Sequence, residues 1–382
     1  MNKALLILLC MFFLQGSFTV FAQTKIEPAK PQKSTVGTGK NNAITDVPGI
    51  EVGHYDRNNT GTTVVLTRSG VVGGVDVRGS APGSRETDLL NPTNLVDKVN
   101  AVVLTGGSAY GLATGDGVML WLEEKKIGWP VGGGNVVPIV AAAVLYDPGR
   151  FGRTFQDRPT AEFGRKASEN ASSGPVPMGN VGAGAGAISG GLKGGIGTAS
   201  VDLGNGVIVG AIVAINSAGS TVNPETGEFY AKYLEVNSEF GGLKPPFSSA
   251  SLSIGQGFSV ASNDPGEPVK NTTIAVVATN VQLTKAQAKK IAEMAHDGMA
   301  RAVRPAHTMF DGDTVFSLAT GELDPAVLKQ QAAWGNMAAN VNKIGGAAAD
   351  ALARAIVHAM LNAQTVGTVP SYKDKYPGAF TK

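Results

Sequence analysis

Cysteine is almost absent from this chain of 382 residues, which contains only Cys10. Cys10 lies in an apolar run that follows Lys3 and leads to the small-residue sequence Val20-Phe21-Ala22. A positive residue, a short apolar run and then small residues are typical of a secretory signal peptide, and the run is too short for a membrane span. We therefore expect residues 1–22 to be a signal peptide cleaved after Ala22, and a periplasmic or secreted protein without disulfides or thiol chemistry.

Charged residues are also few, at 16% of the chain, and 32 Lys and Arg nearly balance 30 Asp and Glu. Because no strong field of one sign results, the composition predicts no nucleic-acid partner and no membrane partner. Hydrophobic residues make up 43%, which is enough for a sizeable core. Residues 23–41 are rich in Lys, Pro, Gln, Ser and Thr, so we expect a disordered lead-in there.

Glycine is what the chain has in excess, with 51 residues, nearly twice the usual share of about 7%. The glycines follow no period, which excludes collagen, and they cluster between apolar runs. Glycine permits tight turns and close approach of two backbones. This distribution is typical of a layered fold with many tight turns.

Apolar runs at strand spacing and at helical spacing occur in separate clusters along the chain. A short strand broken by a Pro-Gly turn is predicted over 43–52, and strands are predicted over 62–67, 71–78, 101–105, 207–215 and 274–279. The apolar run 136–147 is interrupted by Pro138, which favours a buried edge strand or a segment that changes from loop to strand and ends at Tyr146. Few of the links resemble regular βαβ units, so we predict an α+β fold, a sandwich of β-sheets flanked by helices.

Two helices are predicted near the C-terminus. Thr284 and Gln287 have the spacing of a capping box, which starts a helix whose apolar face extends to Val303. The second helix, over 347–364, is rich in alanine and can therefore pack closely against its neighbours.

Two glycine motifs suggest other enzymes but lack the required spacing or context. A nucleophile elbow around Ser108 needs glycine at the position of Tyr110, but glycine comes one residue later. Residues 182–187 imitate a dinucleotide fingerprint, but no buried strand precedes them. We therefore expect no nucleotide cofactor.

The stretch from Lys270 to Asn280 changes from loop to strand at Thr272. It follows the turn-rich segment 262–268 and continues as a short β-branched apolar run. We interpret the Asn271–Thr272 bond as one that the protein cuts itself, which makes Thr272 a new N-terminus. An ordinary threonine-rich strand start and an Asn-x-Thr glycosylation site are the alternatives.

The chemistry of threonine explains why such a cut matters. A threonine hydroxyl is a poor nucleophile at neutral pH, but an α-amino group, whose pKa is about 7.7–8.0, can accept its proton. The reaction also needs a donor for the oxyanion, such as Asn216, and carboxylates that hold the threonine, such as Asp311 and Asp313. Lys193 can lower the pKa of the amine by its charge. By themselves, Asn216 is as well explained as a turn former and Lys193 as a side chain that reaches solvent.

Five ordered segments are distinctive when they are taken together. They are Ile44-Thr45-Asp46-Val47-Pro48-Gly49-Ile50 with Val52-Gly53-His54, Leu104-Thr105-Gly106-Gly107-Ser108-Ala109-Tyr110-Gly111-Leu112, Lys193-Gly194-Gly195-Ile196-Gly197-Thr198-Ala199-Ser200, Asn271-Thr272-Thr273 and Phe310-Asp311-Gly312-Asp313-Thr314. The chain thereby resembles the L-aminopeptidase/D-esterase family, which includes β-aminopeptidases and 6-aminohexanoate-oligomer endohydrolases. The segments span nearly all of the chain after the signal peptide.

The resemblance implies a self-processing hydrolase of the N-terminal-nucleophile type with an αββα sandwich. The sandwich would be built from two fragments of one precursor, residues 42–271 and 272–382, and often assembles as a tetramer. Its substrates would be short peptides, peptide amides or esters, cleaved through an acyl-enzyme without a cofactor or a metal.

The resemblance also implies roles for individual residues. Thr272 would be the nucleophile and Asn271 the residue before the cut. Asp311 and Asp313 would orient Thr272, and Lys193 would lie beside it. Asn216, or the nearby Asn223, would bind the oxyanion, and Tyr146 would line the substrate pocket. Several members have Ser after the cut, and Ser and Glu in place of the two acids. The pattern here is nearer to the nylon-oligomer hydrolases, which does not establish that substrate.

Two other classes of protein stay open at this stage. One is an N-terminal-threonine acyltransferase that moves an acyl group between amino acids. The other is a non-enzymatic secreted binding protein, in which His307, Asp311 and Asp313 would hold a metal. An Asp-x-Asp sequence is more often a simple turn, and no second histidine lies near His307.

Overall fold

A nine-stranded sheet forms the centre of the part that the computed structural model describes, residues 37–246, 271–329 and 336–380. The strand order is β10-β11-β12-β13-β2-β4-β7-β3, and β1 also pairs with β2. The bounds are β1 Glu51–Arg57, β2 Thr60–Val77, β3 Ser84–Arg85, β4 Lys98–Thr105, β7 Val140–Val144, β10 Gly195–Asp202, β11 Ile208–Ile215, β12 Ile274–Thr279 and β13 Thr314–Ala319. The predicted signal peptide, the lead-in up to residue 36 and the segment 262–268 lie outside the described residues.

The strand β2 divides this sheet into two halves. A register shift between Leu66 and Val71 interrupts its pairing with β4. The part of β2 before the shift also pairs with β1, and the part after it pairs with β13. The predicted strands 62–67 and 71–78 are therefore one strand, continued through a bulge of the kind that lets a sheet fold over.

Alternating side chains along the strands fill three separate cores. In β12, Ile274 and Val276 share a core with residues of β4 and β7, whereas Ala275 and Val277 belong to the core beneath the helices α3 and α5. In β4, Val103 points the other way, into a core shared with α1 and α2. Because successive side chains of a strand lie on opposite faces, each half-sheet contacts helices on one face and the other half-sheet on the other face. The layers are therefore α, β, β and α, which confirms the predicted sandwich.

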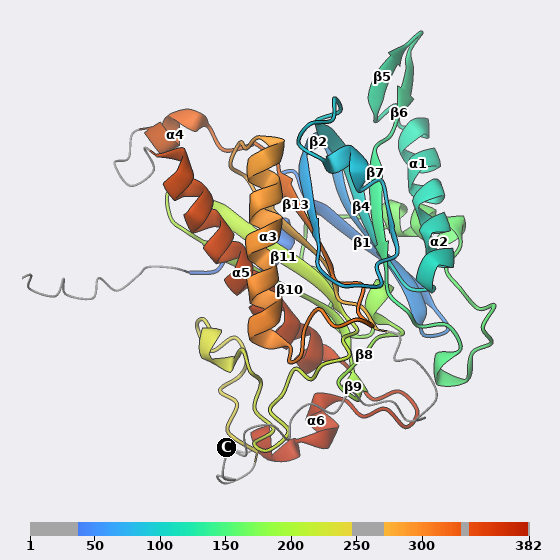
Figure 1. The fold of residues 1–382 in the computed structure, drawn as a ribbon, viewed down its shortest axis with the longest axis vertical. Coiled ribbons are helices and arrows are strands. Elements are labelled where there is room, and N and C mark those ends of the chain that lie inside the picture. Colours follow the sequence, from blue (N-terminus) through green and yellow to red (C-terminus); the bar gives the residue numbers. More distant parts are fainter. Residues whose placement is uncertain (1–36, 247–270, 330–335, 381–382) are drawn as a thin grey trace, which may run out of the picture. The chain divides into compact units, whose positions relative to one another are not determined.

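Figure 1 shows the helices on the two sides of the strands, with α3 and α5 on one side and α1 and α2 on the other. The helix bounds are α1 Thr114–Glu124, α2 Ala161–Glu169, α3 Lys285–Ala302, α4 Pro325–Lys329, α5 Met337–Asn362 and α6 Tyr372–Lys375. The predicted capping box is confirmed, since Thr284 and Gln287 each bond the backbone of the other at the start of α3. The alanine-rich helix begins earlier than predicted, at Met337, where the side chain of Asn336 accepts a hydrogen bond from Ala338 N.

Close packing of α5 accounts for part of the glycine excess. A Cβ added to Gly298 of α3 would lie 1.9 Å from the carbonyl oxygen of Ala349, and one added to Gly197 of β10 would lie 2.0 Å from that of Ala355. Only glycine lets the backbones approach this closely. The helix α5 is long and apolar enough to cross a membrane, but 83% of its most apolar stretch is buried inside the protein, so it is a core helix here.

Three predicted segments differ from the structure. The part of 43–52 that precedes the Pro-Gly turn is not a strand: Ile44–Asp46 form a 3₁₀ turn, held by the Asp46 carboxylate, which accepts hydrogen bonds from Asn41 N at 2.8 Å and Ala43 N at 3.0 Å. The run 136–147 splits at Pro138 into β6 (Asn135–Val137), which forms a hairpin with β5 (Trp129–Gly132), and β7. Strand β7 is not at an edge, because it lies between β4 and β3.

The third difference is at the start of the folded part. Residues 37–41 belong to it rather than to the predicted lead-in, since Gly37 forms a β-bridge with Asp202 and the backbone of Gly39 bonds the hydroxyl of Ser200.

Candidate active site

Sheet topology brings four chain segments together at one end of β12. Strands β12 and β13 are parallel neighbours, with Ile274 opposite Thr314, so the residues just before them lie side by side. Strand β11 is antiparallel to β12, with Ala214 opposite Ile274, so Asn216 comes next to Thr272. The end of β2 lies opposite the start of β13 in the same way. Residues distant in sequence therefore meet around Thr272.

Thr272 itself is buried, with 4% of its surface exposed. Its hydroxyl donates a short hydrogen bond to the carbonyl oxygen of Asn271, the residue before it. The backbone N–H of Gly312 donates to the same hydroxyl oxygen at 3.2 Å. The backbone N–H of Thr272 donates to the carbonyl oxygen of Asn216 at 2.8 Å. The hydroxyl is thus fixed against the peptide bond that precedes it.

Asp313 is held on both of its oxygens. One accepts a hydrogen bond from Thr273 N at 2.7 Å. The other accepts from His307 N at 3.0 Å and lies 2.8 Å from the ring atom Nδ1 of His307. Asp313 therefore fixes the residue that follows Thr272, and His307 fixes Asp313.

Asp311 has the same kind of support. Its carboxylate accepts hydrogen bonds from Ala218 N at 3.2 Å, and from Thr308 N at 3.2 Å and Thr308 Oγ1 at 2.5 Å. Its backbone forms a parallel β-bridge with Asn271. Burial and the neighbouring charge of Asp313 raise the pKa of Asp311, and the bonds from Thr308 and Ala218 act against that rise.

The side chain of Asn216 bonds residues other than Thr272 in the uncut chain. Its Oδ1 accepts hydrogen bonds from Arg150 Nη1 at 2.5 Å and from Ile188 N at 3.0 Å, and its Nδ2 donates to Tyr146 O at 3.4 Å. Because both neighbours are donors, the atom that they contact must be the amide oxygen and not the nitrogen. Asn223 instead accepts a hydrogen bond from Glu225 N in a turn, so Asn216 is the asparagine that contacts Thr272.

Lys193 is fully buried and donates to the carbonyl oxygens of Gly184 at 2.9 Å and Gly194 at 2.7 Å. Burial lowers the pKa of Lys193 to about 7; the charge of Arg150 acts in the same direction and that of Asp147 acts against it. Burial also lowers the pKa of Arg150 to about 10. Arg150 therefore interacts with both residues: its charge lowers the pKa of Lys193, and it donates a hydrogen bond to Asn216. The amino group of Lys193 itself bonds the two backbone carbonyls named above.

A cavity of about 310 Å³ opens at Thr272. Its lining consists of Ala81, Pro82, Gly83, Ser108, Ala109, Val144, Leu145, Tyr146, Asn271, Thr272, Met309 and Phe310. No charged side chain belongs to the lining in the part of the chain that the structure describes. Ser108 adopts a positive φ of 54°, which few residues other than glycine adopt, and it is part of the cavity lining.

Sequence reasoning missed three contributors to this site. Gly312 appears in the sequence only as the centre of an Asp-Gly-Asp turn, yet its N–H bonds the Thr272 hydroxyl. Arg150 follows Asp147 in a loop with no recognisable motif, and it is the arginine that holds Asn216. His307 is suggested by the sequence only as a metal ligand, whereas here it supports Asp313. No local signal identifies the first two.

The residues suggested for a metal are engaged with protein atoms. His307 bonds Asp313, and Asp311 bonds Thr308 and Ala218. Within the described ranges no group of three His, Cys, Asp or Glu side chains is arranged to hold a metal ion. The geometry here is that of a hydrogen-bonded turn.

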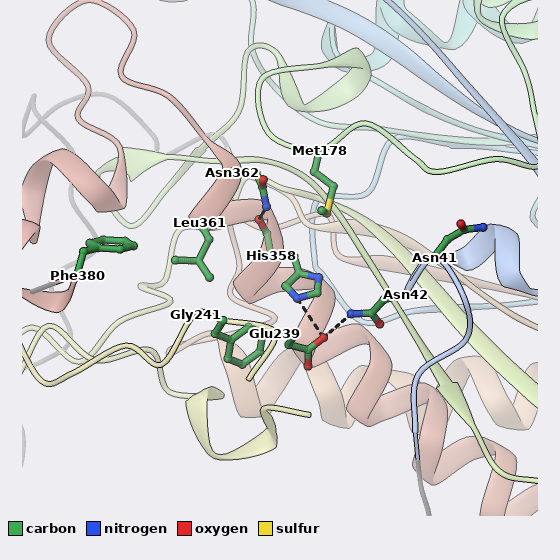
Figure 2. A pocket seen from close by; sticks show the side chains of 10 residues that line it. Asn41, Asn42, Met178, Glu239, Gly241, His358, Leu361, Asn362 and Phe380 are labelled. Atoms are coloured by element: carbon green, nitrogen blue, oxygen red, sulfur yellow. Dashed lines mark hydrogen bonds and ion pairs between the residues drawn. The ribbon is translucent and has the colours of Figure 1, made fainter. Parts of the chain in front are cut away.

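A second cavity, of about 480 Å³, lies away from this chemistry, beside the C-terminal end of α5 (Figure 2). Its polar wall is the carboxylate of Glu239. Figure 2 shows His358 and Asn42 directed at it, at 3.1 Å and 2.5 Å. Arg354 donates to the same carboxylate at 2.5 and 2.6 Å. Burial would raise the pKa of Glu239, but the bonds from His358 and Arg354 prevail and lower it to about 2.

The lowered pKa of Glu239 predicts a loss of stability in acid. The pKa of this carboxyl group is about 2 in the folded chain and about 4.3 in the unfolded chain. Between these pH values the unfolded chain therefore binds more protons than the folded chain. The contribution of Glu239 is therefore fully present above pH 4.3 and is lost as the pH falls toward 2. Denaturant titrations of the wild type and of Glu239→Gln between pH 2 and 6 measure this, and the stability of the variant should vary less with pH. Equal slopes for both proteins would contradict the prediction.

The comparisons with known proteins fit this geometry. A family model described as Peptidase family S58 matches residues 42–373. An uncharacterized aminopeptidase of Mycobacterium tuberculosis is 48% identical over 354 residues, which cover 89% of this chain and 99% of that protein. A 6-aminohexanoate-oligomer endohydrolase of Kocuria sp. is 30% identical over 335 residues, which cover 84% and 87% of the two chains.

Among solved structures, that of an L-aminopeptidase D-Ala-esterase/amidase from Ochrobactrum anthropi is similar with a TM-score of 0.63 and 24% identity, over 87% of this chain and 89% of that one. That protein has a variant of the N-terminal-nucleophile hydrolase fold. The predicted resemblance and the predicted fold are confirmed.

Proposed function

This chain belongs to peptidase family S58 and is a hydrolase, and from that premise we propose that it cuts its own Asn271–Thr272 bond. In this proposal Thr272 then hydrolyses short peptides, peptide amides or esters from their N-terminal end. We also propose that residues 1–22 act as a signal peptide, which would place this activity outside the cytoplasm.

The position of the Thr272 hydroxyl is the observation that carries the proposal. The hydroxyl donates a hydrogen bond to the carbonyl oxygen of Asn271 and accepts one from the N–H of Gly312. Asn216 and Asp313 bind the backbone N–H groups of Thr272 and Thr273. A nucleophile held next to a carbonyl in this way avoids most of the entropic cost of the reaction.

Self-cleavage in this proposal is a transfer from nitrogen to oxygen. The hydroxyl oxygen of Thr272 bonds to the carbonyl carbon of Asn271, the carbon–nitrogen bond breaks, and the hydroxyl proton moves to the nitrogen of Thr272. Water then hydrolyses the ester, which leaves the carboxylate of Asn271 and the free amine of Thr272. The carbonyl of Asn216, already 2.8 Å from that nitrogen, accepts one of the N–H groups of the amine.

Turnover of a substrate uses the same atoms. The amine takes the proton of the Thr272 hydroxyl, the oxygen attacks the acyl carbon of the substrate, and the amine of the substrate leaves with that proton. Water then hydrolyses the acyl-enzyme ester, which releases the acid and restores the Thr272 hydroxyl. In this proposal the charge of Lys193, whose own pKa burial lowers to about 7, acts to lower the pKa of the Thr272 amine. The bond from Asn216 Nδ2 to Tyr146 O is long, at 3.4 Å, so this N–H is available to an oxyanion.

The cavity supports a substrate class. Its apolar walls and the Tyr146 and Ser108 positions fit a substrate whose side chain is uncharged, because a charged side chain would lose its hydration there without a partner. We therefore expect amides and esters of small neutral amino acids to be better substrates than those of lysine or glutamate.

Mass spectrometry of the purified wild type and N-terminal sequencing test the proposal. We expect two fragments, of which the smaller begins Thr-Thr-Ile-Ala-Val. An active preparation in which the chain is uncut would contradict it.

Gly312→Ala is expected to slow self-cleavage about 100-fold, because displacing reacting groups by about 1 Å has effects of that size. A Cβ at this position would lie 2.6 Å from Ala81 O and 2.9 Å from the Thr272 hydroxyl, so the turn or the hydroxyl must move. Gly346→Ala is the matched control, since its Cβ would have no neighbour within 4 Å. The fraction of cut chain after expression and timed incubation measures the effect; equal cutting in both variants would refute the expectation.

A further inference from the structure

A half-buried arginine lies stacked on two exposed aromatic rings near the cavity. The guanidinium carbon of Arg158 is 3.7 Å from the ring centre of Tyr110 and 5.4 Å from that of Phe155. The two rings meet edge to face at 6.2 Å. Tyr110 is 58% exposed and Phe155 45%. Stacking on aromatic faces orients a guanidinium and leaves the N–H groups along its edge free to bind.

In the part of the chain that the structure describes, no acid pairs with the charge of Arg158. Several surface arginines there do have carboxylate partners, as Arg68 has Glu51 and Arg165 has Glu124. Within those same ranges no hydrogen bond or ion pair of the Arg158 guanidinium is found, and the exposed carboxylate of the adjacent Asp157 forms no ion pair with it. Arg158 is therefore a positioned cation able to accept a planar anion, for which a carboxylate has the matching shape.

The stacked arginine lies close to the wall of the cavity. Ser108 and Ala109 line the cavity at Thr272, and Tyr110 is the next residue in the same 3₁₀ turn. A Cβ on Gly107 would lie 2.9 Å from Pro159 Cδ, so the segment that carries Arg158 packs against this turn. Tyr110, and with it the stacked Arg158, is thus one residue along the chain from the lining of the cavity.

We propose that Arg158, with Tyr110 and Phe155, binds the terminal carboxylate of the leaving part of the substrate. The inference rests on the proposed function, because it takes Thr272 as the point of cleavage. It names the substrate class more narrowly: short peptides or oligoamides with a free carboxylate, rather than simple amides and esters.

Matched substrates test the subsite separately from the catalytic chemistry. The hydrolysis of alanyl-alanine and of its C-terminal amide is compared in the wild type, in Arg158→Gln and in a control, Arg57→Gln. Arg57 is also stacked, 5.6 Å from the ring of Phe163, but it is exposed and lies by α2. In Arg158→Gln the ratio of kcat/KM for the acid to that for the amide should fall about tenfold, the low end for a charge-assisted hydrogen bond, with the amide rate unchanged. The control should keep the wild-type ratio.

A second measurement does not depend on turnover. Phenylglyoxal modifies accessible arginines, and peptide mapping reports the rate at Arg158. N-acetyl-alanyl-alanine should protect Arg158 from modification while its C-terminal amide should not, and neither should protect Arg57. Because the site is exposed, this protection should weaken as salt is added.

The outcomes separate the two proposals. An unchanged acid-to-amide ratio in Arg158→Gln, or equal protection by acid and amide, overturns the carboxylate subsite while leaving Thr272 as the nucleophile. A wild type that stays uncut and inactive would overturn the proposed function, and protection of Arg158 by the acid alone would then still establish a carboxylate site.

Discussion

Replacing Thr272 by alanine is expected to leave the chain whole and to lower hydrolase activity by at least about 10⁴-fold, the order of loss when a catalytic nucleophile is removed. The reason is that one oxygen serves twice, first against the carbonyl carbon of Asn271 and then against the substrate. A denaturing gel shows the uncut chain, and initial rates on an alanine amide show the activity. Thr272→Ser keeps a hydroxyl and should still be cut, more slowly.

The neighbouring threonine supplies the control. Thr273 is as buried as Thr272, but its hydroxyl has no hydrogen-bond partner within the described ranges, and its backbone N–H is what binds Asp313. Thr273→Val keeps the shape and the N–H, so this variant should fold and be cut like the wild type. Full cutting of Thr272→Ala, or no cutting of Thr273→Val, would show that the nucleophile has been misassigned.

Arg354→Met is expected to destabilise the folded chain by about 3–5 kcal/mol, the usual cost of leaving a buried charge without its partner. Arg354 is 1% exposed and donates two hydrogen bonds to Glu239, a third to Ser200 O at 2.8 Å and a fourth to Asn42 Oδ1 at 2.9 Å. Methionine fills the space but leaves the carboxylate of Glu239 without its main counter-charge. Urea denaturation measures the change in the free energy of unfolding.

An exposed ion pair of similar type provides the comparison. Arg301 bonds Asp350 at 2.6 Å, but their side chains are 39% and 45% exposed, so Arg301→Met should cost at most about 1 kcal/mol. Adding Glu239→Gln to Arg354→Met removes the stranded charge and should recover part of the stability. If Glu239→Gln lowers the stability of Arg354→Met as much as it lowers the stability of the wild type, the two residues are not energetically coupled.

Some of the helices and strands could be predicted from local sequence, and others could not. The helix start at Thr284 was predictable because a capping box involves residues three apart, and the buried strand 274–279 because its side chains are all apolar or threonine. The merging of 62–67 and 71–78 into one bent strand was not predictable, because the bulge depends on pairing with β4. The place of β7 between two other strands depends on non-local pairing in the same way.

The candidate site likewise contains residues that local sequence identifies and residues that it does not. Thr272, Asp311 and Asp313 carry their chemistry in their side chains, so their residue types and their order along the chain are enough to make them candidates. Arg150 and Gly312 contribute through hydrogen bonds to partners 66 and 40 positions away. A hydrogen bond between such positions leaves no mark in the neighbouring sequence.

By itself, the sequence determined which atoms are able to react and where strands and helices form, because nucleophilicity, capping and hydrophobic period are properties of single residues and their near neighbours. Only the tertiary structure decided that the Asn216 carbonyl, rather than its side chain, contacts Thr272, and that Asp313 binds the N–H of Thr273. Those contacts follow from the registers of β11, β12 and β13, and a register is set by packing between distant segments.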